Sequence, residues 1–266
     1  MIRIGVLALQ GDFEEHVAVF SRLGVEALEV RLPEQTNGLD GLVIPGGEST
    51  TFTRLMAEYG LQEPIRRLAE DGVPVWGTCA GTIVLARLAS DMPRPGLGLM
   101  DIVVERNAFG RQVDSFEAGL LIPVLGDEPF PGVFIRAPTI RQVGPEVEVL
   151  ARLPAPASGG PAHRDGGAHG AGLDGGTVVA ARHGRLLATT FHPELTGDLR
   201  MHRYFLALVE ASHRGRALGP VAEPPSAVTL SEAKGPVKPD SSSAAGGLRM
   251  TGLSGGCGSG RTGGTP

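Results

Sequence analysis

Cysteines and aromatic residues are scarce in this chain of 266 residues. There are two cysteines, Cys79 and Cys257, and aromatic side chains make up 5% of the residues. Cys79 lies in a strongly patterned region, whereas Cys257 lies in a stretch rich in glycine and serine. We therefore expect no structural disulfide between them, and Cys79 needs an explanation of its own.

The chain also lacks a cationic surface and a long apolar run. Its formal net charge is -5 and no basic run is interleaved with aromatic residues, so we do not expect nucleic acid as a partner. The apolar run Ile4–Leu9 is too short for the core of a signal peptide, and no other segment is long and apolar enough to cross a bilayer. We expect a soluble, cytoplasmic protein that makes no membrane contact.

Glycine and proline are abundant but unevenly placed. The 40 glycines and 21 prolines gather between residues 154 and 176 and again after residue 215, whereas residues 2–153 have ordinary globular patterning. We predict one folded domain over residues 1–213, a surface insertion at about 154–176, and a low-complexity, disordered tail over 214–266. His163 and His169 of the insertion have no supporting cysteine or further histidine, so we interpret them as solvated and predict no metal site.

Strand and helix patterns alternate along the first hundred residues. Predicted strands cover residues 2–9, 25–30, 41–44 and 73–76, and predicted helices cover 13–23, 51–59, 64–70 and 82–89. Strands then dominate at 101–105, 116–124, 133–136, 147–152, 177–182 and 186–191, before a last helix at 198–211. This order predicts an α/β fold with a mostly parallel central sheet covered by helices. We expect Asp12 to cap the first helix, with Glu15 as its capping-box partner.

The segment from Val73 to Thr82 indicates a short apolar strand, then Gly-Thr-Cys-Ala-Gly, then a helix. This is the form of a nucleophile elbow with Cys79 in place of serine, where flanking glycines permit a turn too sharp for larger side chains. A thiol at a helix N-terminus is favoured as the thiolate, which is the form that attacks. The competing interpretation is a small buried cysteine at a strand–helix junction.

A second candidate element ends the strand predicted at 186–191. There His192 and Glu194 are joined by Pro193, and in an extended chain residues two apart point the same way. A carboxylate beside an imidazole fixes its tautomer and stabilises the imidazolium, as a base paired with a cysteine requires. The competing interpretation is a surface histidine beside a glutamate that caps a helix.

A third element follows the strand at 41–44, where Gly46 and Gly47 precede a helix. Backbone amides at such glycines can face a ligand, so the amides of Gly47 and Ala80 are candidates for stabilising an oxyanion. Gln10, at the end of the first strand, is a candidate for helping that site assemble. A plain glycine turn and an ordinary polar loop residue are the competing interpretations.

Together the three elements resemble the class I glutamine amidotransferase family, whose members carry a cysteine elbow, a glycine-rich oxyanion strand and a late His-Pro-Glu. Within that family, the chain is similar to the glutaminase subunits of pyridoxal 5'-phosphate synthase. Further stretches carry the resemblance, namely residues 5–12, 45–51, 106–112 and 134–138. It runs from about residue 1 to residue 213 and is broken only by the insertion.

The resemblance implies a three-layer class I glutamine amidotransferase-like fold and a glutaminase activity that needs no metal or organic cofactor. It implies a catalytic triad of Cys79, His192 and Glu194. The residues that it implies for the glutamine site are Gly47, Glu48, Ser49, Arg106, Ile135 and Arg136. It further implies a partner, the synthase subunit of a hetero-oligomeric complex, which receives ammonia released from L-glutamine and builds pyridoxal 5'-phosphate.

Two other functions stay open. The same sheet and elbow fit a cysteine hydrolase of another amide or of a peptide, and they also fit a regulatory subunit whose triad is idle. From the residues alone, Arg106 and Arg136 fit surface salt bridges, which contribute little to stability.

Overall fold

The computed structural model describes residues 2–106, 115–154 and 176–217. Nearly all of the predicted insertion and most of the predicted tail lie outside the described residues, as do residues 107–112 of the resemblance. The last helix, α5 (Arg200–Ala217), runs into the first positions of the region we expected to be tail. No helix of the described part has a stretch long and apolar enough to cross a membrane.

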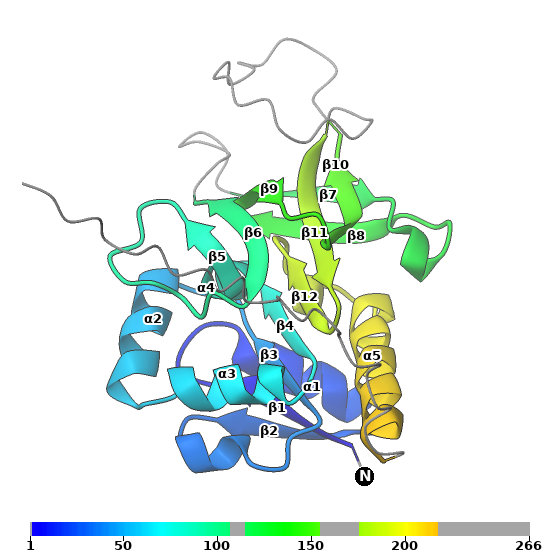
Figure 1. Cartoon of the computed structure of the whole chain (residues 1–266). Helices are drawn as coiled ribbons and strands as arrows, with labels where there is room; N and C mark the ends of the chain where they lie inside the picture. Colours follow the sequence, from blue (N-terminus) through cyan, green and yellow to red (C-terminus); the bar gives the residue numbers. More distant parts are fainter. Residues whose placement is uncertain (1, 107–114, 155–175, 218–266) are drawn as a thin grey trace, which may run out of the picture. The chain divides into compact units, whose positions relative to one another are not determined.

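The centre of the fold is a ten-stranded sheet in the order β2-β1-β3-β4-β12-β11-β9-β6-β5, with β10 paired to β11 (Figure 1). Neighbours from β2 to β12 are parallel, and β9, β10 and β11 add antiparallel pairs. The strands are β1 (Arg3–Leu7), β2 (Glu26–Val30), β3 (Gly41–Ile44), β4 (Val75–Thr78), β5 (Ala86–Ala89), β6 (Met100–Glu105), β9 (Thr139–Val143), β10 (Glu148–Leu153), β11 (Thr177–His183) and β12 (Leu186–Thr189). A separate hairpin consists of β7 (Ser115–Leu120) and β8 (Phe130–Ile135).

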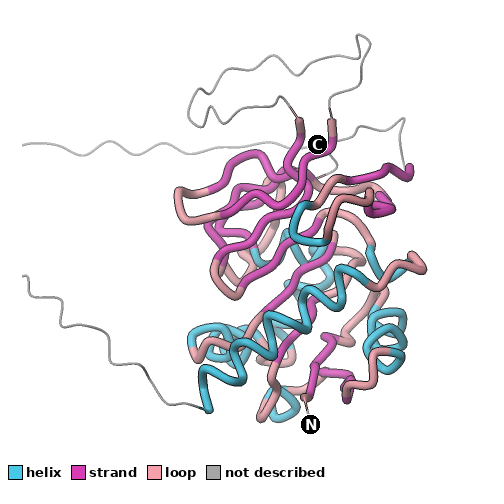
Figure 2. The backbone as a smooth tube through the Cα atoms, turned by 90° about the vertical axis from the view of Figure 1, so that its right-hand side faces the viewer, coloured by secondary structure: helices cyan, strands magenta, loops and turns pink. Residues whose placement is uncertain are grey.

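Helices cover both faces of the sheet, which gives three layers. One apolar core joins the sheet to α2 (Ser49–Glu58), α3 (Gln62–Glu70) and α4 (Ala80–Leu85), and the other joins it to α1 (Phe13–Arg22), α5 and the β7–β8 hairpin. Helix α5 lies at the right of Figure 1 and crosses in front of the strands in Figure 2. Burial on both faces explains why β3 and β4 are buried at every position rather than alternating. The predicted α/β class is confirmed.

Some predicted elements were wrong in type or missing. The helix expected over 82–89 ends at Leu85, and Ala86–Ala89 instead forms strand β5 beside β6. Strand β9 was not predicted, nor were three short 3-10 helices at Pro33–Thr36, Pro123–Leu125 and Pro193–Leu195. The capping box was also wrong, because Asp12 is the N-cap of α1 but its side chain makes no cap hydrogen bond.

The turn between β4 and α4 is as sharp as the glycine spacing predicted. Cys79 has φ 45° and ψ -104°, a left-handed conformation that a residue with a side chain rarely adopts. A Cβ on Gly77 would lie 2.5 Å from the carbonyl of Gly81, and a Cβ on Gly81 would lie 1.9 Å from the carbonyl oxygen of Ile44 in β3. Both glycines are therefore required for α4 to lie this close to the sheet.

The glycine at position 81 provides a test of this packing. In Gly81→Ala the new methyl group meets backbone rather than a flexible side chain, so we expect the free energy of unfolding to fall by about 2 kcal/mol or more. Gly197→Ala is the matched control, because a Cβ there meets nothing within 4 Å and should change stability by less than about 0.5 kcal/mol. Urea unfolding measures both, and equal stability of the two variants would contradict the close approach of α4 to β3.

Candidate active site

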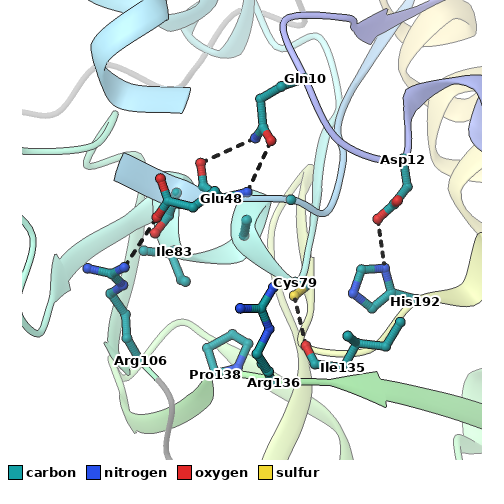
Figure 3. A pocket seen from close by; sticks show the side chains of 13 residues that line it. Gln10, Asp12, Glu48, Cys79, Ile83, Arg106, Ile135, Arg136, Pro138 and His192 are labelled. Atoms are coloured by element: carbon teal, nitrogen blue, oxygen red, sulfur yellow. Dashed lines mark hydrogen bonds and ion pairs between the residues drawn. The ribbon is translucent and has the colours of Figure 1, made fainter. Parts of the chain in front are cut away.

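A cavity of about 470 Å³ opens at one edge of the sheet (Figure 3). Its walls come largely from the segments that follow the carboxyl ends of four adjacent parallel strands, β1, β3, β4 and β12. Open α/β sheets place ligand sites at this edge. Nine of the ten residues predicted for the site line the cavity, and the tenth, Glu194, is buried behind His192. Gln10, the candidate for helping the oxyanion site assemble, also lines the cavity, and the lining residues that were not assigned to the site are Asp12, Ile83 and Pro138.

Cys79 stands between β4 and α4 with its side chain toward the cavity (Figure 3). Its backbone N–H donates to the Thr189 carbonyl at 2.8 Å, which ties the turn to the end of β12. The Thr82 hydroxyl, in the first turn of α4, lies 2.9 and 2.8 Å from the carbonyl oxygens of Gly77 and Thr189 and shares its one proton between them. The strained turn is thus held from both strands, and the sulfur lies 3.9 Å from the Ile135 carbonyl oxygen.

His192 and Glu194 lie together as predicted, but for a different reason. They do not alternate along a strand, because β12 ends at Thr189 and His192 is the N-cap of the short 3-10 helix Pro193–Leu195. That turn brings His192 Nδ1 to 2.7 Å from Glu194 Oε1. The other side of the imidazole faces Cys79 (Figure 3), so the three residues predicted as a triad are neighbours.

The pair is buried, and its charges depend on its contacts. Burial alone would lower the pKa of His192, but hydrogen bonds with Asp12, Cys79 and Glu194 outweigh it and raise that pKa to about 12. Burial raises the pKa of Glu194, and the hydrogen bond from His192 opposes this rise. The imidazole is therefore protonated at neutral pH and stabilises the carboxylate beside it.

Asp12 is a residue of the site that sequence reasoning missed. Its Oδ2 lies 3.3 Å from His192 Nδ1, the same nitrogen that contacts Glu194 (Figure 3). The ion pair lowers the pKa of Asp12, chiefly through the hydrogen bond with His192. Because Asp12 stands just before a helix, we interpreted it as a cap. Its position after the carboxyl end of β1 could also have indicated the active site, because such sites lie at this edge of the sheet. A Cβ on Gly46 would lie 2.3 Å from His192 Cε1 and 2.9 Å from Asp12 Oδ2, so a glycine is needed there.

Gly47 and Ala80, the predicted oxyanion residues, both line the cavity. Gly47 has φ +139°, and Ala80 is the first residue of α4, where an N–H has no acceptor inside the helix. Gln10 braces this region, because its side chain both donates to the Glu48 carbonyl and accepts from the Glu48 N–H, each at 3.2 Å. A Cβ on Gly47 would lie 2.6 Å from the Gln10 amide nitrogen, so the two are packed together.

Glu48 caps helix α2 and lies opposite Arg106. Its carboxylate accepts from the N–H groups of Thr50 and Thr51 at 3.1 and 2.7 Å and from the Thr50 hydroxyl. Burial would raise the pKa of Glu48, but these hydrogen bonds outweigh it and lower the value to about 2. Arg106 Nη2 lies 3.4 Å from Glu48 Oε1, and its Nη1 donates to the Asp91 carbonyl at 2.8 Å. The two predicted glutamine contacts thus pair with one another across the cavity.

The other predicted glutamine contacts form the remaining wall. Ile135 ends β8, and Arg136 follows it with φ 42°, so the chain turns sharply at the cavity. Both side chains are exposed, whereas Ser49 is buried with its hydroxyl 3.6 Å from the sulfur of Met92. The end of the hairpin and the start of α2 therefore line the same cavity as the thiol.

The described residues contain one group with the spacing of metal ligands, made of Asp12, His192 and Glu194, with one atom each within 4.8 Å of the others. The imidazole nitrogen that faces both carboxylates is already hydrogen-bonded to one of them. We therefore interpret the group as a hydrogen-bonded acid–base unit.

Comparison with known proteins gives the family. A model of the SNO glutamine amidotransferase family matches residues 6–211. The chain belongs to this family. The resemblance seen in the motifs is confirmed, and membership accounts for a cysteine elbow and a His-Pro-Glu at one edge of an α/β sheet.

The relatives include proteins described as pyridoxal 5'-phosphate synthase subunit PdxT. That of Pelotomaculum thermopropionicum is 55% identical over 205 residues, covering 77% of this chain and 94% of the relative. That of Moorella thermoacetica is 53% identical over 210 residues, covering 78% of this chain and 100% of the relative. A crystal structure described as a glutamine amidotransferase aligns with a TM-score of 0.67 and 48% identity, over 78% of this chain and 98% of that one.

The second carboxylate on the imidazole of this family member can be tested directly. Asp12→Asn removes one negative charge from His192 Nδ1, so we expect the pKa of His192 to fall from about 12 by about one unit or more. A histidine pKa raised on folding stabilises the fold below pH ~6.5, and this stabilisation is lost as pH rises toward the folded value. The variant should therefore be less stable than the wild type at neutral pH, and this difference should shrink only as the pH rises toward the wild-type value of about 12.

Titration of the imidazole nitrogens by NMR measures the shift. Asp40→Asn is the control, because Asp40 lies 2.8 Å from His213 Nδ1 and precedes the amino end of β3, whereas the cavity residues follow the carboxyl end of that strand. It should leave His192 unchanged. An unchanged His192 pKa in Asp12→Asn would mean that the 3.3 Å contact contributes nothing.

Proposed function

We propose that this chain is the glutaminase subunit of a pyridoxal 5'-phosphate synthase. It hydrolyses L-glutamine to L-glutamate and ammonia, and it passes the ammonia to a synthase subunit. Membership of the glutamine amidotransferase family and the identity of 50% or more to subunits described as PdxT support this proposal. The single observation that carries the chemistry is Cys79, in a strained turn at the cavity, beside the buried His192–Glu194 pair.

The first half of the reaction forms a thioester. The sulfur of Cys79 attacks the carbon of the glutamine side-chain amide, and the carbonyl π electrons move onto oxygen. The amides of Gly47 and Ala80 donate to that oxyanion. His192 is protonated at neutral pH because its pKa is about 12, so it can give its proton to the leaving nitrogen as the C–N bond breaks and ammonia departs.

The second half reverses the roles. His192 is now neutral and takes a proton from water, whose oxygen attacks the thioester carbon. The C–S bond breaks, glutamate leaves, and the thiolate–imidazolium pair is restored. Glu194 holds the ring in place through Nδ1 at 2.7 Å in both halves, which keeps the other nitrogen directed at the reacting atoms.

Glutamine would be held between Glu48 and Arg106. Glu48 is ionised at neutral pH, with a pKa of about 2, and can accept from the substrate ammonium, while the Arg106 guanidinium can donate to the substrate carboxylate. Their mutual contact is long, at 3.4 Å, and the Glu48 side chain is 50% exposed. A substrate zwitterion can therefore replace this contact at small cost, because an exposed ion pair contributes little.

The ammonia goes to the synthase subunit of a hetero-oligomeric complex. The alignment with the PdxT subunit of Pelotomaculum thermopropionicum covers 94% of that relative, which supports an equivalent partner for this chain. We also propose that the complex works in the cytoplasm, because a free catalytic thiol stays reduced there.

Removing the thiol tests the proposed nucleophile. Cys79→Ala in the complex with the synthase subunit should reduce ammonia release from glutamine to background, because no other group forms the thioester. Cys257→Ser is the matched control, since it removes the second cysteine of the chain and should keep wild-type turnover. Ammonia is measured by a coupled dehydrogenase assay with and without the partner. Undiminished turnover in Cys79→Ala would refute the assignment.

Chelation separates the acid–base unit from a metal site. If Asp12, His192 and Glu194 act only through hydrogen bonds, then EDTA should leave the rate of ammonia release from the complex unchanged within error. A loss of activity that an added divalent ion restores would show that this group holds a metal.

A further inference from the structure

Two histidines that the reaction above does not use lie buried behind Glu194. His16 of α1 and His202 of α5 are both fully buried, with their rings 5.1 Å apart. His16 Nδ1 lies 3.0 Å from His202 Nε2, and His16 Nε2 lies 3.3 Å from both the Thr78 hydroxyl and Glu194 Oε2. A chain of contacts therefore runs from α5 through α1 to the carboxylate of the proposed triad.

Both imidazoles are neutral. Burial lowers the pKa of His202 to about 3 and holds the pKa of His16 well below its usual value. The neighbouring charged and titratable groups that act on the two rings are Glu194, His192 and Arg22. A neutral imidazole has one donor and one acceptor nitrogen, so the 3.0 Å contact between the rings holds a single proton.

The position of that proton follows from the groups at the two ends. If it sat on His16 Nδ1, then His16 Nε2 would turn a lone pair toward the Glu194 carboxylate, and His202 Nδ1 would be a buried N–H without an acceptor among the described residues. If it sits on His202 Nε2, then His16 Nε2 is a donor toward Thr78 and Glu194. His202 Nδ1 is then an unpaired acceptor, which proteins tolerate in their interior more often than an unpaired N–H. The second arrangement is favoured.

Glu194 needs such a donor. Its Oε1 receives His192, whereas its buried Oε2 accepts no aligned hydrogen bond in the described part of the chain. His16 Nε2, at 3.3 Å, is near enough for charge–dipole attraction but is better aligned with the Thr78 hydroxyl. Thr78 is the last residue of β4 and immediately precedes Cys79. The Nε2–H of His16 therefore reaches both the strand that carries the nucleophile and the Glu194 carboxylate.

We propose that His16 is a positioning residue for the glutaminase reaction: its Nε2–H fixes Glu194 as an oriented anion against His192, and His202 fixes the tautomer of His16. This inference rests on the proposed function. It assigns to the buried histidines an electrostatic role beyond packing against Trp76 and Phe20, which their rings also contact.

The test compares His16→Leu with His16→Gln in the complex with the synthase subunit. Leucine fills the site without a donor, whereas the glutamine amide can place an N–H near the position of Nε2. For His16→Leu we expect kcat to fall by about 10- to 100-fold, the range for leaving a buried charged acceptor without a donor facing it, with KM changed by less than about threefold. His16→Gln should recover most of the loss.

The pH profile distinguishes this role from packing. Without the His16 donor the Glu194 carboxylate is less stable, its pKa rises, and the acidic limb of kcat/KM moves to higher pH. His202→Phe should show a smaller shift in the same direction, since it removes only the group that fixes the tautomer. His213→Leu, which removes an exposed histidine, should keep the wild-type profile.

The possible outcomes separate the proposed function from the positioning role of His16. Absence of glutaminase activity in the wild-type complex refutes the proposed function. Wild-type kcat and pH profile in His16→Leu, or equal losses in the leucine and glutamine variants with no movement of the acidic limb, overturn the positioning role alone. If His16→Leu does not fold, His202→Phe still tests the role, because a wild-type pH profile in that variant would also overturn it.

Discussion

The parallel pairing of β4 with β12 is the constraint on which the candidate site depends. It aligns Thr78 with Thr189, so the chain leaves both strands at the same level, into Cys79 on one side and toward His192 on the other. Residues more than a hundred positions apart are joined there by the Cys79 N–H to Thr189 carbonyl bond and by the Trp76 indole, which donates to the Thr189 hydroxyl at 3.1 Å. Because these bonds are buried, they hold the strained turn without competition from water.

The strain and the buried charge of the site are offset by the surrounding packing. A left-handed backbone at a cysteine costs on the order of 1–3 kcal/mol, and a buried carboxylate costs more unless it is paired. The two glycines of the elbow lower the first cost by letting α4 pack against β3. The short 3-10 helix after His192 lowers the second, since it places an imidazolium on Glu194. Both devices are local in sequence, and both depend on the long-range β4–β12 pair.

That division explains what the sequence could predict. The elbow, the His-Pro-Glu turn and the alternating strands are set by neighbours along the chain, so patterns at short spacing were sufficient for the fold class and for Cys79, His192 and Glu194. Arg106 and Arg136 were predicted only through the family resemblance, because their own neighbours indicate no ligand site. Asp12 was missed because the same residue type caps helices, and only the third dimension shows that its carboxylate turns to His192. His16 was missed because a single histidine on a helix has no local signal. Strand β5 was missed because the apolar run that ends α4 continues into it, and pairing with β6 decides its form.

The two carboxylates on His192 differ in one physical respect, their contact with solvent. The Glu194 side chain is fully buried, whereas the Asp12 side chain is 37% exposed at the cavity. Water and salt screen the exposed charge far more than the buried one, so Glu194 orients the imidazole at any ionic strength while the attraction of Asp12 depends on what occupies the cavity mouth. Glu194 consequently fixes the orientation of the His192 ring, and Asp12 changes the pKa of His192. An imidazole gripped equally by two buried carboxylates would be too stable as the cation to return its proton during catalysis.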